Sequence, residues 1–344
     1  MDTTVTKRFG GSRPELFLSA LGLYLIFSAY LYWPYIRDIG GQGILFAINP
    51  VVAAWGTYFL SKRWVNNWTP SVLAGAVYGF SPFALSFAGF QQPVAGLSYV
   101  MIPWLFLPSV YWHKTKTPDM FRFCVRVLFS LLPFAAIIGM FWCASQKWAG
   151  PHFLMPVSAT LTSKHFLDLI FPLFQKGPYL TFGTYHASLV LAVMGLFVLI
   201  KIQRITVFLP VAAAMVLCFL EPVVGVPPIV WAAIPILFLA ILSGLGFQSV
   251  FWAGKSDSKW ILTCAIIASI LAAFFGGLAY KRMVVGAVLQ WTAMMYALTA
   301  VSLWLMLFFA YTGIRVKPIK WGVLTAAVAI DVIFSARYLV DTLF

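Results

Sequence analysis

The stretch WILTCAIIASILAAFFGGLAY, residues Trp260–Tyr280, contains no charged side chain. A bilayer core about 30 Å thick requires roughly 20 apolar residues in one helix, because unpaired backbone groups are too costly in hydrocarbon. The stretch therefore predicts a membrane-spanning helix. Similar runs extend from Leu16 to Val340 and together predict an all-α, polytopic transmembrane bundle of about eleven spans. The other candidate spans are Leu16–Ile36, Ile44–Leu60, Ser71–Gly89, Val94–Trp112, Cys124–Ala144, Thr184–Ile200, Ile205–Leu220, Ile229–Phe247, Met283–Tyr311 and Trp321–Val340.

The composition favours one membrane domain covering residues 1–344. Of the 344 residues, 62% are hydrophobic and 9% are charged, against about 45–50% and roughly 25% in soluble domains. The net charge of +14 comes from small groups of Lys and Arg between apolar runs, which argues against a nucleic-acid partner. The four cysteines lie inside apolar runs without zinc-binding spacing, so we predict no metal site built on them.

The distribution of Lys and Arg predicts the orientation. Short cytoplasmic loops are enriched in these residues. With the amino terminus in the cytoplasm, 16 of them fall in cytoplasmic loops and 7 fall on the other side. We therefore predict a multi-pass protein of a bacterial cytoplasmic (inner) membrane, with its carboxyl terminus on the outer face.

One connection, residues 145–183, is far longer than the others and falls on the predicted outer, periplasmic side. Such length favours a functional loop. Within it, Thr160–Phe174 carries apolar residues at helical spacing, which predicts a short helix lying on the membrane surface.

Several polar residues in and near this loop are candidates for lipid binding. Lys cations and a Tyr side chain can contact a lipid phosphate, although cations and aromatic residues are also common at any membrane interface. A His/Asp set can transfer protons or bind a metal, although no HxH or HxxxH spacing occurs and solvated loop histidines are common. The candidate residues are Lys164, His165, Asp168, Lys176, Tyr179 and His186.

Asp331 differs because it lies inside the last predicted span. A charge at bilayer depth costs at least ~2.5–3.5 kcal/mol, so we expect Asp331 to face the bundle interior. Its partner is either Arg337, about one and a half turns away, or a group on a neighbouring helix.

Five segments resemble a known family. They are NPVVAAWGTYFLSKRW (Asn49–Trp64), LAGAVYGFSPFALSFAG (Leu73–Gly89), MIPWLFLPSVYW (Met101–Trp112), LDLIFPLFQKGPYLTFGTYHASLVLAVMGLF (Leu167–Phe197) and LFLAILSGLGFQSVF (Leu237–Phe251). Together they are similar to bacterial YfhO-type proteins, relatives of the protein mannosyltransferases with the GT-C glycosyltransferase fold. The similarity covers about two-thirds of the chain.

The resemblance implies an enzyme that transfers a sugar from a polyprenyl-phosphate carrier at the outer face. In that family a carboxylate in the first outer loop acts as a base or a metal-associated acid, so a divalent cation is expected if the protein is catalytic. Here that loop is only RDIGGQG (Arg37–Gly43), and Asp38 is its one acid. The short loop departs from the family pattern and favours an alternative, a non-catalytic subunit or scaffold that binds membrane lipids or other membrane proteins. A transporter is less favoured, because the sequence shows no internal repeat.

Overall fold

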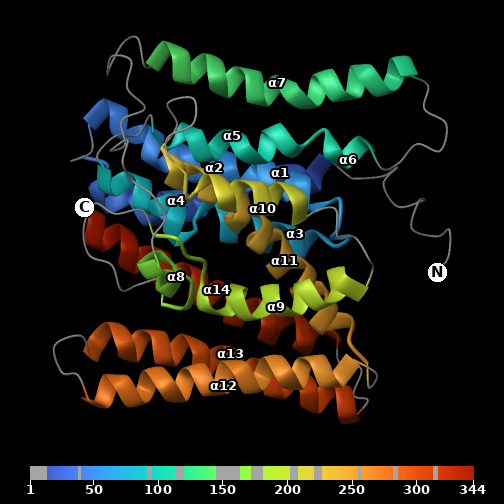
Figure 1. Cartoon of the computed structure of the whole chain (residues 1–344), viewed down its shortest axis with the longest axis vertical. Helices are drawn as coiled ribbons and strands as arrows, with labels where there is room; N and C mark the ends of the chain where they lie inside the picture. The colour runs from blue at the N-terminus through green and yellow to red at the C-terminus, as the bar shows by residue number, and fades with distance from the viewer. Residues whose placement is uncertain are drawn as a thin grey trace.

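The computed structural model describes residues 14–37, 40–90, 95–112, 120–144, 163–171, 181–201, 208–220, 227–254, 257–281, 286–312 and 317–344. Within these ranges every regular element is a helix (Figure 1). In chain order they are α1 (Pro14–Tyr32), η2 (Trp33–Tyr35), α2 (Gly40–Ser61), α3 (Trp68–Gly79), α4 (Pro82–Ser86), η3 (Phe87–Phe90), α5 (Leu97–Phe106), α6 (Ser109–Trp112), α7 (Met120–Ala144), α8 (Ser163–Ile170), α9 (His186–Lys201), α10 (Phe208–Leu217), η6 (Pro228–Ala232), α11 (Ala233–Trp252), α12 (Ser258–Lys281), α13 (Gly286–Thr312) and α14 (Lys317–Leu343).

Seven helical segments among the described residues are long and apolar enough to cross a bilayer, which confirms the prediction of a helical membrane protein. They correspond to α1 with η2, α2, α7, η6 with α11, α12, α13 and α14. The other four predicted spans coincide with shorter helices, namely α3, α5, α9 and α10. The predicted span Ser71–Gly89 is broken after Gly79, where Ser81 caps α4 through the Ala84 N–H and Pro82 begins that helix.

Contacts between distant segments define two ends of the bundle. The Tyr35 hydroxyl donates to Asp341 at 2.5 Å, and the ring of Phe344 stacks on Tyr35. The last turns of α1 and α14 therefore lie together, at what we call the C-terminal end, on the left in Figure 1. Because α1 and α14 both finish there, they run in the same direction, as an odd number of membrane crossings requires.

The opposite end carries most of the described cations. There the Trp68 indole donates to the Leu16 carbonyl, and the Gln248 side chain accepts the Asn66 N–H. Chain order places a group of described Lys and Arg side chains at this end, which we call the basic end: Lys62, Arg63, Lys259, Lys317 and Lys320. The described cations at the C-terminal end are fewer: Arg37, Lys281 and Arg337.

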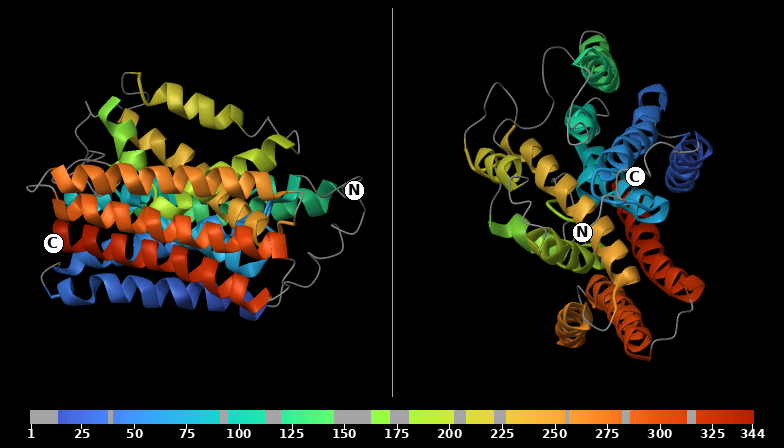
Figure 2. Two further views of the ribbon diagram at one scale, coloured as in Figure 1. Left: turned by 90° about the horizontal axis from the view of Figure 1, so that it is seen from below. Right: turned by 90° about the vertical axis from the view of Figure 1, so that its right-hand side faces the viewer.

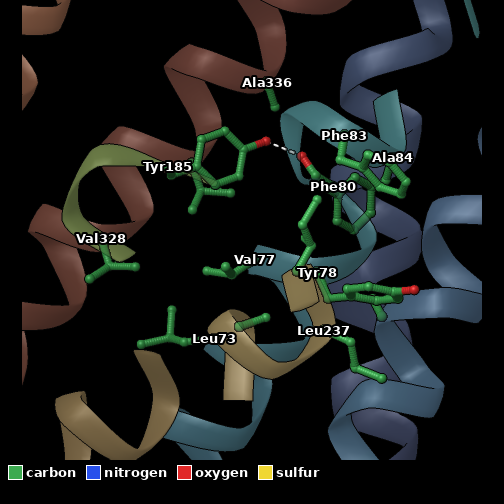
Figure 3. Packing of buried hydrophobic residues seen from close by; sticks show 14 of the residues in the cluster. Leu73, Val77, Tyr78, Phe80, Phe83, Ala84, Tyr185, Leu237, Val328 and Ala336 are labelled. Carbon is green, nitrogen blue, oxygen red and sulfur yellow. Dashed lines mark hydrogen bonds between the residues drawn. The ribbon is translucent and has the colours of Figure 1, made fainter. Parts of the chain in front are cut away.

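The centre of the bundle is a continuous apolar core that joins α1–α5 to α9, α11, α13 and α14. Tyr185 lies fully buried in it between Val328 and Ala336, and its hydroxyl donates to the Phe80 carbonyl (Figure 3). This bond ties the segment before α9 to the break between α3 and α4.

Helices α9 and α11 approach closely through glycines. A Cβ at Gly246 of α11 would overlap the Leu191 carbonyl of α9, and a Cβ at Gly195 of α9 would overlap the Leu242 carbonyl of α11. Small residues at such crossings allow membrane helices to pack backbone against backbone. The helices α7 and α12 lie at opposite edges of the bundle when it is viewed along the helix axes (Figure 2, right). Both expose large apolar side chains such as Phe129 and Ile270, as lipid-facing helices do.

Candidate functional site

A buried ionisable pair joins the start of α9 to the middle of α14. Nδ1 of His186 lies 2.8 Å from Oδ1 of Asp331, and both side chains are buried to 1% exposure or less. The other carboxylate oxygen of Asp331 accepts the Ala187 N–H at 2.7 Å, and the Ser335 hydroxyl donates to Oδ1 at 3.3 Å. Asp331 therefore satisfies an N–H of the first turn of α9 that has no partner within that helix.

Tyr296 of α13 connects this pair to α8. Its ring packs edge-on against His186 with 5.0 Å between ring centroids, and its hydroxyl donates to the Ile170 carbonyl at 2.7 Å. Nε2 of His186 has no hydrogen-bond partner among the described protein groups. The arrangement fixes the positions of α8, α9, α13 and α14 relative to one another.

Closer to the C-terminal end, Arg337 connects α14 to α1. Its Nη1 donates to the carbonyls of Tyr30 and Leu31, at 3.1 and 3.2 Å. These carbonyls belong to the last turn of α1, where they lack helical partners, so Arg337 caps that helix. Its Nε contacts the Asp341 carboxylate at 2.9 and 3.1 Å, and Asp341 also accepts the Tyr35 hydroxyl.

Two hollows flank Arg337. The larger is open, has a volume of about 610 Å³ and lies along the end of α1, where Tyr30 and Trp33 line it. The smaller has a volume of about 190 Å³ and lies between α13 and α14. Its lining includes Trp291, Met295, Phe334, Ser335, Tyr338 and Asp341. We call Arg337, Asp341 and the side chains of the two hollows the Arg337 site.

The Arg337 site combines a cation, a carboxylate and several aromatic faces. A guanidinium binds phosphate oxygens through paired N–H donors. Aromatic rings supply apolar area with polar edges at a membrane interface. Ser335 lines the smaller hollow and also contacts Asp331, so the Arg337 site lies directly next to the buried pair.

The structure brings together some of the predicted site residues. His186 and Asp331 form the buried pair, so His186 lies in the interior and not on the outer surface where the loop histidines were expected. Asp168 is also buried, on α8. The backbone of Lys164 and His165 belongs to α8, within the predicted surface helix Thr160–Phe174. The structure does not describe their side chains. The predicted residues Asp38, Lys176 and Tyr179 fall outside the described residues.

Sequence reasoning singled out His186 and Asp331 separately but did not pair them, because 145 positions separate them. It offered Arg337 as one partner of Asp331, but Arg337 binds Asp341. The aromatic side chains of the Arg337 site were missed as a group, since they come from the end of α1, the start of α13 and the end of α14. The only signal in the sequence was the isolated Arg337 near the end of the last apolar run.

Comparison with known protein families, with curated proteins and with solved structures found no match for this chain. Among the side chains that the structure describes, no group of three or more His, Cys, Asp or Glu residues is arranged to hold a metal ion.

Proposed function

We propose that this protein is a GT-C-like integral membrane protein of about eleven spans that handles a polyprenyl-phosphate-linked sugar at the outer face of a bacterial cytoplasmic membrane. In this proposal the lipid phosphate binds at the Arg337 site, the isoprenoid chain lies along the neighbouring apolar helices, and the sugar contacts the aromatic side chains. The observation that carries the proposal is the position of Arg337 between two aromatic-lined hollows at one end of a membrane bundle.

The charge distribution supports the assignment of this end to the outer face. Cations gather at the basic end, and the positive-inside tendency assigns that end to the cytoplasm. The Arg337 site and Phe344 then lie outside. A periplasm-active reporter fused after Phe344 should therefore function, whereas activity of only a cytoplasm-active reporter there would contradict the orientation.

Lipid retention tests the binding site. Purified protein in mild detergent should retain polyprenyl phosphate, but not the uncharged polyprenol, when bound lipid is counted by native mass spectrometry. Arg337→Gln should weaken retention about tenfold, because charge-assisted hydrogen bonds contribute roughly 1.5–3 kcal/mol. Arg337→Lys keeps the charge and should retain an intermediate share.

Lys281→Gln is the matched control, since it removes a cation from the same end at an exposed position of α12. It should leave retention unchanged. Equal retention of polyprenol and its phosphate, or equal losses in Arg337→Gln and Lys281→Gln, would count against a phosphate site at Arg337.

A scaffold without catalysis is the second candidate, and a specific observation favours it. The described acids near the proposed site already have protein partners, with Asp331 in the core and Asp341 bound to Arg337 and Tyr35. Such acids serve helix packing, and only Asp38 remains as a predicted base.

Asp38→Asn separates the two candidates. In a transferase that uses this base, the substitution should lower turnover of a polyprenyl-phosphate-sugar donor by roughly 10²–10⁴-fold. In a scaffold it should change neither lipid retention nor partner binding. We expect the second outcome, because the seven-residue loop Arg37–Gly43 offers few groups to orient an acceptor beside Asp38. Sugar transfer by the parent protein that is lost in Asp38→Asn would overturn this expectation.

A further inference from the structure

A third hollow, lined mostly by apolar side chains, lies toward the basic end and belongs to no site described above. Its volume is about 190 Å³. One wall comes from the last residue of α5, Phe106, and the first residue of α6, Ser109, and the facing wall comes from Pro210 and Val211 of α10. The floor is formed by α11, against which α10 packs through Phe208 and Phe238. We call this hollow the α10 groove.

The α10 groove is elongated along the helix axes. Its lining on α11 extends from Ile234 to Ile241, two helical turns or about 10 Å at 1.5 Å per residue. It continues to Leu60 in the last turn of α2 and to Arg63 and Trp64 just after that helix. A helical partner does not fit in this volume, because a helix with side chains is about 10–12 Å across. A segment of a flexible hydrocarbon chain, which is much thinner than a helix, does fit.

The polarity of the α10 groove changes along its length. At the basic end Arg63 contributes a guanidinium whose Cζ lies 4.9 Å from the ring of Trp64, and Lys62 precedes it in the chain. The Lys62 amine does not line the groove and donates to the Asn67 carbonyl at 3.3 Å. The lining from α10 and α11 is entirely apolar. A cation at one end of this apolar groove is complementary to a lipid that has an anionic headgroup and an apolar chain.

We propose that the α10 groove binds one acyl chain of an anionic phospholipid, with the phosphate at Arg63, in the leaflet next to the basic end. Basic pockets between membrane helices bind acidic lipid headgroups in this way. The Trp64 ring lies where an interfacial aromatic side chain contacts the headgroup region. This site is independent of the Arg337 site, which lies at the opposite end of the bundle.

A matched pair of substitutions on α10 tests the proposal. Val211→Trp fills the groove from its wall, whereas Val216→Trp adds the same side chain at an exposed position of the same helix. The delipidated proteins are titrated with phosphatidylglycerol and with phosphatidylcholine, and bound lipid is counted by native mass spectrometry. We expect the parent and Val216→Trp to retain one phosphatidylglycerol tightly, and Val211→Trp to lose it.

Arg63→Gln provides a second variant that leaves the apolar walls unchanged. Its preference for phosphatidylglycerol over phosphatidylcholine should fall roughly fivefold, the usual contribution of one basic residue near a membrane surface, and Arg63→Lys should restore most of it. Equal retention of phosphatidylglycerol by Val211→Trp and the parent, or an unchanged preference in Arg63→Gln, would overturn the proposal. So would polyprenyl phosphate displacing phosphatidylglycerol from the parent at equal concentration.

Discussion

At the scale of single residues, Asp331 is the most constrained polar group of the described core. Its carboxylate accepts from His186, from the Ala187 N–H and from Ser335, and it is excluded from solvent. Removing an acceptor that serves several buried donors leaves each donor unpaired, at about 1–3 kcal/mol per group. The role of Asp331 is therefore to hold α9 against α14, the helix that carries Ser335 and Arg337.

Two substitutions at this position should differ in severity. Asp331→Ala should destabilise the fold by about 3 kcal/mol, because no acceptor remains for the imidazole or for the N–H of α9. Asp331→Asn should destabilise the fold less. Its side-chain carbonyl can accept the Ala187 N–H, and its amide can donate to Nδ1 of His186 when the proton of the imidazole is on Nε2. Thermal unfolding in detergent, followed by the loss of the monodisperse fraction, measures both. An Asp331→Ala variant as stable as the parent would show that the pair is dispensable for folding.

At the scale of elements, the crossing of α9 and α11 depends on two glycines. Gly246→Ala places a methyl group against the Leu191 carbonyl, with backbone on both sides and no flexible side chain to move away. Overpacking of this kind costs typically ~1–3 kcal/mol. Gly276→Ala is the matched control, because a Cβ at that position of α12 meets nothing within 4 Å. In the same unfolding assay the control should equal or exceed the parent, by up to about 1 kcal/mol from helix propensity. Similar losses in both variants would show that glycine content and not this crossing determines stability.

The elements also show which parts of the fold are predictable from local sequence. The apolar run Trp260–Tyr280 matches α12 because hydropathy over one uninterrupted run already determines a membrane helix. The run Ser71–Gly89 is also free of charge but does not form one helix, since Pro82 has no N–H to continue the ladder and Ser81 caps a new helix. The pairing of His186 with Asp331 depends on how α9 and α14 pack. The position of Asp331 inside an apolar run predicts an inward direction but no partner.

At the scale of the whole molecule, the charged groups and the hollows occupy different levels along the helix axes. The basic end carries Lys and Arg beside the α10 groove, the core holds one buried ionisable pair, and the C-terminal end carries the Arg337 site. The edge helices α7 and α12 expose apolar side chains along their length, as helices that face lipid do. This division underlies the two lipid sites proposed above, the Arg337 site at one end of the bundle and the α10 groove toward the other.

Photocrosslinking in membranes tests this account most directly. A polyprenyl-phosphate analogue with a photoreactive group next to the phosphate is irradiated with the protein in vesicles, and the modified peptides are identified by mass spectrometry. The account predicts labelling of peptides that contain Tyr30–Trp33, Trp291 and Phe334–Asp341, reduced by excess polyprenyl phosphate but not by excess polyprenol. Labelling confined to α7 and α12, or labelling around Arg337 that polyprenol reduces equally, would contradict it.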